Sequence, residues 1–159
     1  MMKFRSDFCA SSVANRAVVY RREEFSLDTV PASLSAFTSI LIDDISLEVD
    51  DQGKLVSIWG LCPHTRWKQI QLTPPTAREG ELRALPSSAL TQGVAVRLTE
   101  VGKHLDILFD NNSGWLKISN LPGPVEAVRV LRNAIIQLNA NAEISSLWIR
   151  PEPEVNLCE

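Results

Sequence analysis

An alternation of apolar and polar residues that leads into a turn is the feature of this sequence that most constrains its fold. In the segment 40–49, Ile45, Leu47 and Val49 alternate with polar residues, which is the period of a half-buried β-strand. The next four residues, 50–53, read Asp-Asp-Gln-Gly, and the glycine can supply the positive φ that a short connection needs. Apolar residues resume over 55–59. The sequence therefore predicts a β-hairpin over residues 40–59, with 40–49 as one strand.

A second hairpin is predicted over residues 94–119. Apolar and polar residues alternate over 94–98 and again over 105–109, and the residues 110–114 (Asp-Asn-Asn-Ser-Gly) have strong turn chemistry. The segment 115–119 would be the returning strand. Weaker strand signals occur at residues 17–20, 25–30, 68–73 and 81–85.

One long helix is predicted near residues 124–139. Val128, Leu131, Ile135 and Leu138 have the spacing of a single apolar stripe on a helix, and Pro124 suits a first helical position. A final strand is predicted near residues 144–150, where apolar residues precede two prolines.

These elements together predict an α+β fold. Runs of strands followed by a separate helix are typical of a mainly antiparallel sheet, here of about six to eight strands, with the helix packed on one face. A chain of 159 residues is long enough for a single domain with its own core. We expect flexible ends near residues 1–14 and 152–159, and the sequence shows no clear internal repeat.

Charge and composition exclude several classes of protein. The net charge of −3 argues against a general nucleic-acid binder, which usually carries a basic excess. No apolar run is long enough for a membrane span, so no membrane association is expected. The three cysteines are widely spaced, which favours a reducing compartment and a cytoplasmic location. Residues 1–22 are rich in arginine, which leaves open whether they form a targeting segment.

Cys62 and His64 are the residues most typical of catalytic chemistry. A thiol beside an imidazole can form an activated nucleophile, but no known catalytic motif surrounds this pair, and a cysteine is often only a small buried hydrophobic residue. With His104 they could instead line a ligand pocket. The histidines and cysteines lack the paired spacing of a zinc site, so neither a metal nor a cofactor is predicted.

Clustered acidic residues are the sharpest indication of a binding partner. No lysine or arginine interrupts the five acids of the first hairpin, which are Asp43, Asp44, Glu48, Asp50 and Asp51. Such a cluster can steer and orient a basic partner, although it is also typical of a solvated strand face. Arg66 and Trp67 follow in a loop, where the indole could act as an apolar anchor.

The sequence therefore favours a non-enzymatic protein-binding domain. Its most concrete form is an inhibitor of a basic toxin or nuclease that acts by electrostatic occlusion. In size, charge and lack of catalytic motifs the chain resembles bacterial immunity proteins. One alternative is a small-molecule-binding domain or an unrecognised enzyme with a pocket near Cys62, His64 and Trp67. Another is a chaperone or assembly factor, which could be a homo-oligomer joined through an open sheet edge.

Overall fold

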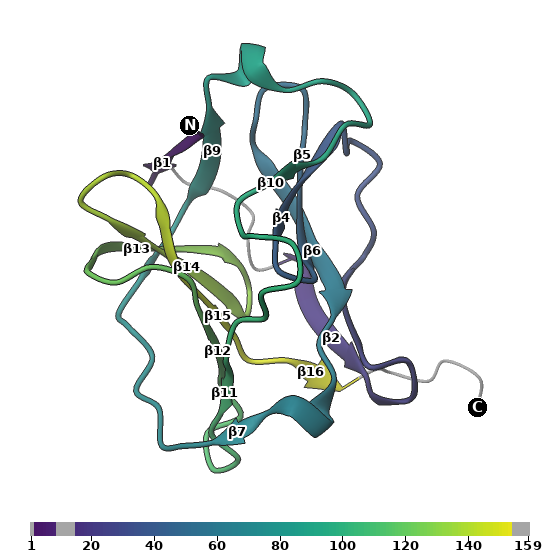
Figure 1. Cartoon of the computed structure of the whole chain (residues 1–159), viewed down its shortest axis with the longest axis vertical. Coiled ribbons are helices and arrows are strands. Elements are labelled where there is room, and N and C mark those ends of the chain that lie inside the picture. Colours follow the sequence, from purple (N-terminus) through teal and green to yellow (C-terminus); the bar gives the residue numbers. More distant parts are fainter. Residues whose placement is uncertain (1, 9–14, 154–159) are drawn as a thin grey trace.

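The computed structural model describes residues 2–8 and 15–153, and β-strands make up nearly all of its regular structure (Figure 1). The only helical segments among these residues are the 3-10 turns Arg22–Glu24, His64–Arg66 and Ser87–Ala89. The strands are β1 Lys3–Asp7, β2 Ala17–Arg21, β3 Ser26–Val30, β4 Thr38–Ile42, β5 Ile45–Val49, β6 Leu55–Leu61, β7 Lys68–Gln69, β8 Arg78–Glu79, β9 Glu81–Leu85, β10 Val96–Arg97, β11 Ile107–Phe109, β12 Leu116–Ser119, β13 Pro124–Leu131, β14 Ala134–Asn139, β15 Ile144–Ile149 and β16 Glu152–Pro153.

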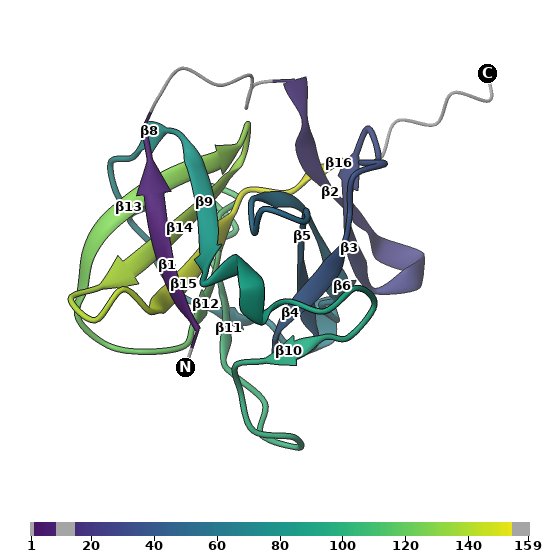
Figure 2. The ribbon, with the colours of Figure 1, turned by 90° about the horizontal axis from the view of Figure 1, so that it is seen from above.

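Two seven-stranded sheets enclose one core. The first has the order β10-β4-β5-β6-β3-β2-β16 and the second the order β7-β11-β12-β15-β14-β13-β8. Figure 2 shows the two sheets side by side, with the small β1–β9 ribbon along one edge. Leu47 and Ile58 of the first sheet and Ile136 and Leu147 of the second belong to the same buried cluster. The inner faces of the sheets therefore bury one another, as in a β-sandwich.

The two sheets have the same topology. In the first, the order β4-β5-β6-β3-β2 is formed by residues 17–61, which we call the first half. In the second, β13-β14-β15-β12-β11 repeats this order with residues 107–149, the second half. Equivalent positions follow from the strand pairing. Leu27 pairs with Gly60 as Leu116 pairs with Ile149, so Leu27 corresponds to Leu116 and Gly60 to Ile149. The residues that precede Gly60 and Ile149, Trp59 and Trp148, are therefore equivalent.

Local details repeat as well. Each half has a two-residue turn between its third and fourth strands, at residues 43–44 between β4 and β5 and at residues 132–133 between β13 and β14. The next turn is capped in the same way in both halves. Asp50 Oδ1 accepts hydrogen bonds from two backbone N–H groups, and Asn139 Oδ1 does so at the equivalent position. A register shift also follows Glu48 in β5 and Gln137 in β14. The fold thus contains two copies of one five-stranded unit, an internal structural duplication that the sequence alone did not reveal.

Short strands connect the two halves. β16, which follows the second half, pairs in parallel with β2 of the first half. β7, which follows the first half, pairs in parallel with β11 of the second half. The edge strands of both large sheets, β10, β16, β7 and β8, have two residues each. Short edges offer few free backbone groups for pairing with another chain.

The predicted α+β class is wrong, because the segment 124–139 forms a β-hairpin and no long helix packs on a sheet. β13 and β14 pair antiparallel through the turn at Arg132 and Asn133. Ile135 and Ile136 are both buried, so β14 has side chains covered on both faces. A strand buried on both faces loses its alternation, and its apolar residues can then match a helical stripe by chance. The second sheet, rather than a helix, covers the first.

The predicted single strand over 40–49 is also divided. The chain turns at Asp43, which has a φ of 54°, and β4 and β5 pair with each other. Aspartate tolerates this left-handed conformation better than most residues. The β5–β6 and β11–β12 hairpins are confirmed, but β10 joins β4 rather than β11. In the second predicted hairpin, residues 94–98 are therefore not a partner of 115–119.

The predicted flexible ends lie partly outside the described residues, as do Cys9 and Cys158. Within the described part, Lys3–Asp7 pairs with β9 and Glu152–Pro153 pairs with β2. No helix in residues 2–8 and 15–153 is long and apolar enough to span a membrane.

Candidate binding face

The five acids of the first hairpin do not form one patch. Asp43 and Asp44 lie in the turn before β5, and Asp50 and Asp51 lie in the turn after it. A strand rises about 3.3 Å per residue, so the five residues of β5 separate the two turns by roughly 17 Å. Glu48 lies between them, on the strand itself. A single compact partner group cannot contact both pairs at once.

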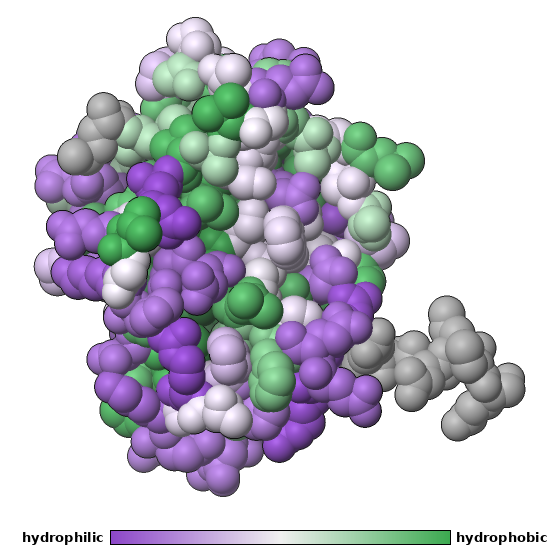
Figure 3. Space-filling view, turned by 45° about the vertical axis from the view of Figure 1, so that its right-hand side comes forward, coloured by the Kyte–Doolittle hydropathy of each residue, from purple (hydrophilic) through white to green (hydrophobic). Residues whose placement is uncertain are grey.

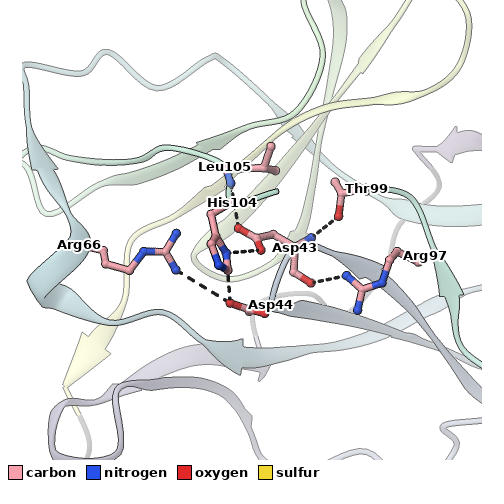
Figure 4. Close-up of polar contacts among 7 residues, drawn as sticks. All are labelled: Asp43, Asp44, Arg66, Arg97, Thr99, His104 and Leu105. Atoms are coloured by element: carbon pink, nitrogen blue, oxygen red, sulfur yellow. Dashed lines mark hydrogen bonds and ion pairs between the residues drawn. The ribbon is translucent and has the colours of Figure 1, made fainter. Parts of the chain in front are cut away.

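Asp43 is largely committed to holding a loop (Figure 4). Its side chain is buried, Oδ2 accepts a hydrogen bond of 2.9 Å from Leu105 N, and Oδ1 lies 3.0 Å from His104 Nδ1. The backbone N–H of Asp43 donates to Thr99 Oγ1 at 2.8 Å. The turn of the first half is thereby fixed to the segment that enters the second half.

Asp44 lies at the edge of the same cluster and is partly exposed. Its Oδ2 is 3.7 Å from His104 Nδ1 and 3.9 Å from Arg66 Nη1. Asp43, Asp44 and His104 offer ligand atoms that all lie within 4.8 Å of one another. A cation bound there would have to displace the hydrogen bonds of Asp43 and would face the Arg66 guanidinium. We therefore interpret the cluster as a set of contacts that holds the turn at 43–44 against the segment 99–105, and not as a metal centre.

The other two acids of the turn pairs differ from each other. Asp50 Oδ1 accepts hydrogen bonds of 2.9 Å from Gln52 N and Lys54 N, so its carboxylate caps the turn. Asp51 is exposed at the tip. Asp43 and Asp50 thus hydrogen-bond to the backbone of a loop or turn. Among the predicted partner-binding acids, no such backbone hydrogen bond engages the carboxylates of Asp44, Glu48 and Asp51 in the described part of the chain.

Cys62 is part of the core. It is fully buried, and desolvation raises the pKa of its thiol to about 11. At neutral pH it is a protonated thiol, which is a poor nucleophile. His64 is held by Tyr20, whose hydroxyl accepts a hydrogen bond from His64 N and lies 3.3 Å from Nδ1. No contact among the described residues joins His64 to His104, so the predicted pocket of Cys62, His64 and His104 does not assemble.

Trp67 packs between the two halves. Its ring centroid lies 5.0 Å from that of Tyr20 and 4.7 Å from that of Phe109. Tyr20 and Phe109 are equivalent positions in the duplication, on β2 and β11. Trp67 is thus half-buried between the two sheets. Packing within the fold accounts for an aromatic residue at this position, and contact with a binding partner is not needed to explain it.

Trp59 is the more exposed of the two equivalent tryptophans. Its side chain is on the outer face of the first sheet and is 46% exposed, whereas Trp148 on the outer face of the second sheet is 4% exposed. Leu61, two residues along β6, is 55% exposed, and Phe25 is 40% exposed. Leu61 pairs with Ser26, the residue after Phe25. Trp59 and Leu61 share one face of β6, and Phe25 lies beside the end of that strand, stacked on His64; we call these three exposed side chains the Trp59 patch.

Three side chains cover Trp148. Gln137 Oε1 accepts a hydrogen bond of 2.8 Å from Trp148 Nε1, the Trp115 ring lies edge-on at 6.4 Å, and Lys117 Nζ lies 5.1 Å from the ring centroid. The equivalent residues of the first half are Glu48, Ser26 and Asp28. The covering amide, indole and ammonium groups are thus replaced by two acids and a serine.

The surroundings of Trp59 are small and polar. Ser46 pairs directly with Trp59 across the sheet; it is 4% exposed, and its Oγ has no hydrogen-bond partner within residues 2–8 and 15–153. Thr29 bonds to the backbone of Ile58, which places Asp28 beside Trp59. Figure 3, which brings the right-hand side of Figure 1 forward, shows one face of the molecule, with pale, weakly polar residues down the middle and a mixture of hydrophilic and apolar groups on both sides.

Trp59 is not among the binding residues predicted from the sequence. The available signal was its position in β6: Ile58 faces the core, so the next residue must face outward. The decisive contrast with Trp148 needs the duplication, which is visible only in the strand pairing. No known protein family matches the sequence, and a search of curated proteins finds no relative.

Proposed function

We propose that this chain is a non-enzymatic protein-binding domain that docks its partner on the outer face of the first sheet, around the Trp59 patch. The observation that carries the proposal is the exposure of Trp59 at a position where its counterpart, Trp148, is covered. Burying a large aromatic side chain contributes strongly to an interface, and tryptophan is enriched at binding hot spots.

The charge around the patch favours a basic partner. Asp28 and Glu48 lie on this outer face, Asp28 paired with Arg21 and Glu48 within electrostatic reach of Arg16, and acids at the rim of an apolar patch steer and orient a cationic surface. The most concrete form is an inhibitor of a basic toxin or nuclease that acts in the cytoplasm by occlusion. The acidic contribution comes from the sheet face, and not from one continuous acidic hairpin.

The proposal is tested by partner capture with matched variants. We expect Trp59→Ala to lose a stoichiometric partner captured from native lysate at low salt. Val125→Ala is the control, because Val125 is also an exposed apolar residue but lies on β13 of the second half. Capture that is unchanged in Trp59→Ala, or lost equally in both variants, would contradict the proposal.

A second candidate function rests on Arg16. This residue lines a cavity of about 270 Å³ together with Ser33, Ser35 and Lys54. Its side chain donates to the carbonyl oxygens of Pro31 and Val56, while the buried Nη2 has no partner. Burial lowers the pKa of the guanidinium, so an anionic ligand there would relieve an unfavourable desolvation.

A small carboxylate or phosphate is the ligand that this cavity would favour. We expect citrate or phosphate to raise the melting temperature of the wild type, and Arg16→Gln to abolish the effect. Arg5→Gln is the control for a general loss of positive charge. An equal shift in all three proteins would indicate only a non-specific salt effect.

A further inference from the structure

The second half of the molecule provides an internal example of a group that covers an outer-face tryptophan. Lys117 pairs with Trp148 across β12 and β15, and its Nζ lies 5.1 Å from the ring centroid. An ammonium group over an indole ring is a cation–π contact, which is favourable because the ring face is electron-rich. The cation over the Trp148 ring therefore comes from a neighbouring strand of the same sheet.

In the first half this cation is replaced by a carboxylate. Asp28 occupies the position of Lys117, and Glu48 occupies the position of Gln137, whose amide accepts the indole N–H. The ring of Trp59 is thus flanked by two acids at the positions where the ring of Trp148 has an ammonium and an amide group. Carboxylates do not stack favourably on an aromatic face, but together with the ring they form a suitable site for a cation from outside.

The two carboxylates remain available to such a group. The Asp28 side chain is 44% exposed, although Oδ2 pairs with Arg21 and Oδ1 accepts a hydrogen bond of 2.8 Å from Thr29 N, so a further cation would share these oxygens. Glu48 is half-buried and pairs with Ser57, so it is diagonal to Trp59. Diagonal neighbours on a sheet are within reach of long side chains, as the Gln137–Trp148 hydrogen bond demonstrates.

A buried hydroxyl points to the same place. Ser46 is directly opposite Trp59 and has an unpartnered Oγ, whereas the equivalent residue of the second half is the apolar Ile135, opposite Trp148. A buried polar atom without a partner is unfavourable until a ligand or water satisfies it. Its position beneath the Trp59 patch is therefore a second, independent indication of a polar ligand.

We propose that Trp59 receives a lysine or arginine side chain of the basic partner, with the cationic head over the indole ring and between the carboxylates of Asp28 and Glu48. This inference rests on the proposed protein-binding function and names the group that is recognised. The partner residue would take the place that Lys117 has over Trp148.

The first test uses an oligolysine peptide as a probe and the indole N–H signals of ¹⁵N-labelled protein as the readout. We expect the Trp59 signal, assigned with Trp59→Phe, to shift on titration, and a glycine–serine peptide of the same length to leave it unchanged. Asp28→Asn combined with Glu48→Gln should weaken binding about tenfold, because both flanking charges are lost.

Asp51→Asn combined with Asp106→Asn is the matched control, since it removes two exposed acids elsewhere. We expect it to weaken binding about twofold or less, through net charge alone. A Trp59 signal that does not respond, or equal losses in the two double variants, would overturn the inference. Trp59→Ala could lose the native partner while the double variant Asp28→Asn with Glu48→Gln keeps it fully. That result would support the docking face and contradict the cation site.

A second test transfers the cover of Trp148 to Trp59. The triple variant Ser26→Trp, Asp28→Lys and Glu48→Gln should bury Trp59 and prevent oligolysine from shifting its signal. The single variant Asp28→Lys keeps the test valid if the triple variant does not fold. It should place an internal ammonium at the ring and lower the probe affinity by at least about tenfold. Unchanged probe binding in Asp28→Lys would contradict the inference.

Discussion

At the scale of single residues, Gly60 shows how tightly the β5–β6 pairing is built. It has a φ of 145°, and a Cβ there would collide with the carbonyl oxygen of Asp44 and approach Ile45 Cα to 2.9 Å. These are backbone atoms, which cannot move aside as a flexible side chain can. Gly60 therefore lets β6 pass close to the turn that carries Asp43 and Asp44.

We expect Gly60→Ala to lower the free energy of unfolding by about 3 kcal/mol, because it combines a steric clash with an unfavourable φ. Gly93→Ala isolates the second effect, since Gly93 has a φ of 73° and open space around its missing Cβ. That control should cost about 1 kcal/mol. Urea unfolding of both variants checks this, and equal losses would mean that the contact with Asp44 is not restrictive.

Asp110 connects the turn after β11 to the segment around Leu72. Hydrogen bonds from the backbone N–H groups of Leu72, at 3.0 Å, and Asn112, at 2.9 Å, hold the pKa of its carboxyl below the ordinary value. A carboxyl whose pKa is lower in the folded state stabilises the fold above its unfolded pKa, and this stability is lost as the pH falls through the folded pKa.

Asp110→Asn should therefore have a lower melting temperature than the wild type at pH ~7, and the difference should shrink below pH ~4. Thermal unfolding across this range is the measurement. Asp51→Asn is the control and should follow the wild type at every pH. A difference between Asp110→Asn and wild type that grows in acid would contradict the assignment.

At the scale of elements, the two-residue turns join the halves. Asn133 in the turn between β13 and β14 is 7% exposed; it accepts a hydrogen bond from Val18 N and donates to the carbonyl oxygens of Val18 and Arg150. Asp43 makes the corresponding kind of contact from the first half, with Leu105. Each half therefore fixes its turn to the strand entrance of the other half.

We expect Asn133→Asp to destabilise the protein by at least about 3 kcal/mol, because it removes both donors and leaves a buried carboxylate facing two carbonyl oxygens. The equivalent exchange in the first half, Asp44→Asn, should change stability by less than about 0.5 kcal/mol, since Asp44 is partly exposed. Urea unfolding distinguishes them. Comparable effects in the two halves would show that the turns are not specialised.

The elements also show what the sequence could predict. β9 was predicted with its observed bounds, and β15 to within one residue, because each has strand-forming residues between clear breaks. β14 was predicted as helix because burial on both faces removed its alternation. The sequence could not show that Asp43 and Asp50 have hydrogen-bonding roles within the fold, because these roles depend on the three-dimensional positions of Leu105 and Lys54.

At the scale of the whole molecule, the duplication explains why the two sheets share one topology, while their outer faces differ. Trp115, Lys117 and Gln137 cover Trp148 in the second half. The first half has Ser26, Asp28 and Glu48 at these positions, and Trp59 is exposed. Because β7 and β16 pair across the halves, the first sheet can present an open face while the second helps to hold it in shape.

This exchange of strands also predicts how the chain would tolerate division. β7 belongs to the second sheet although it follows the first half, and β1 pairs with β9 across the same linker. A cut in the partly exposed segment 73–77, which has no regular secondary structure, should therefore give two fragments that are each unfolded alone, because each lacks strands and the opposing sheet that buries its apolar face. Mixed together, the fragments should restore the β-sheet circular dichroism spectrum and the dispersed amide NMR signals of the intact chain. The Trp148→Ala fragment serves as a control, since loss of this buried residue should weaken reassembly at least about tenfold. If either fragment folded by itself, the halves would be independent units, and the Trp59 face would not need the second half for its shape.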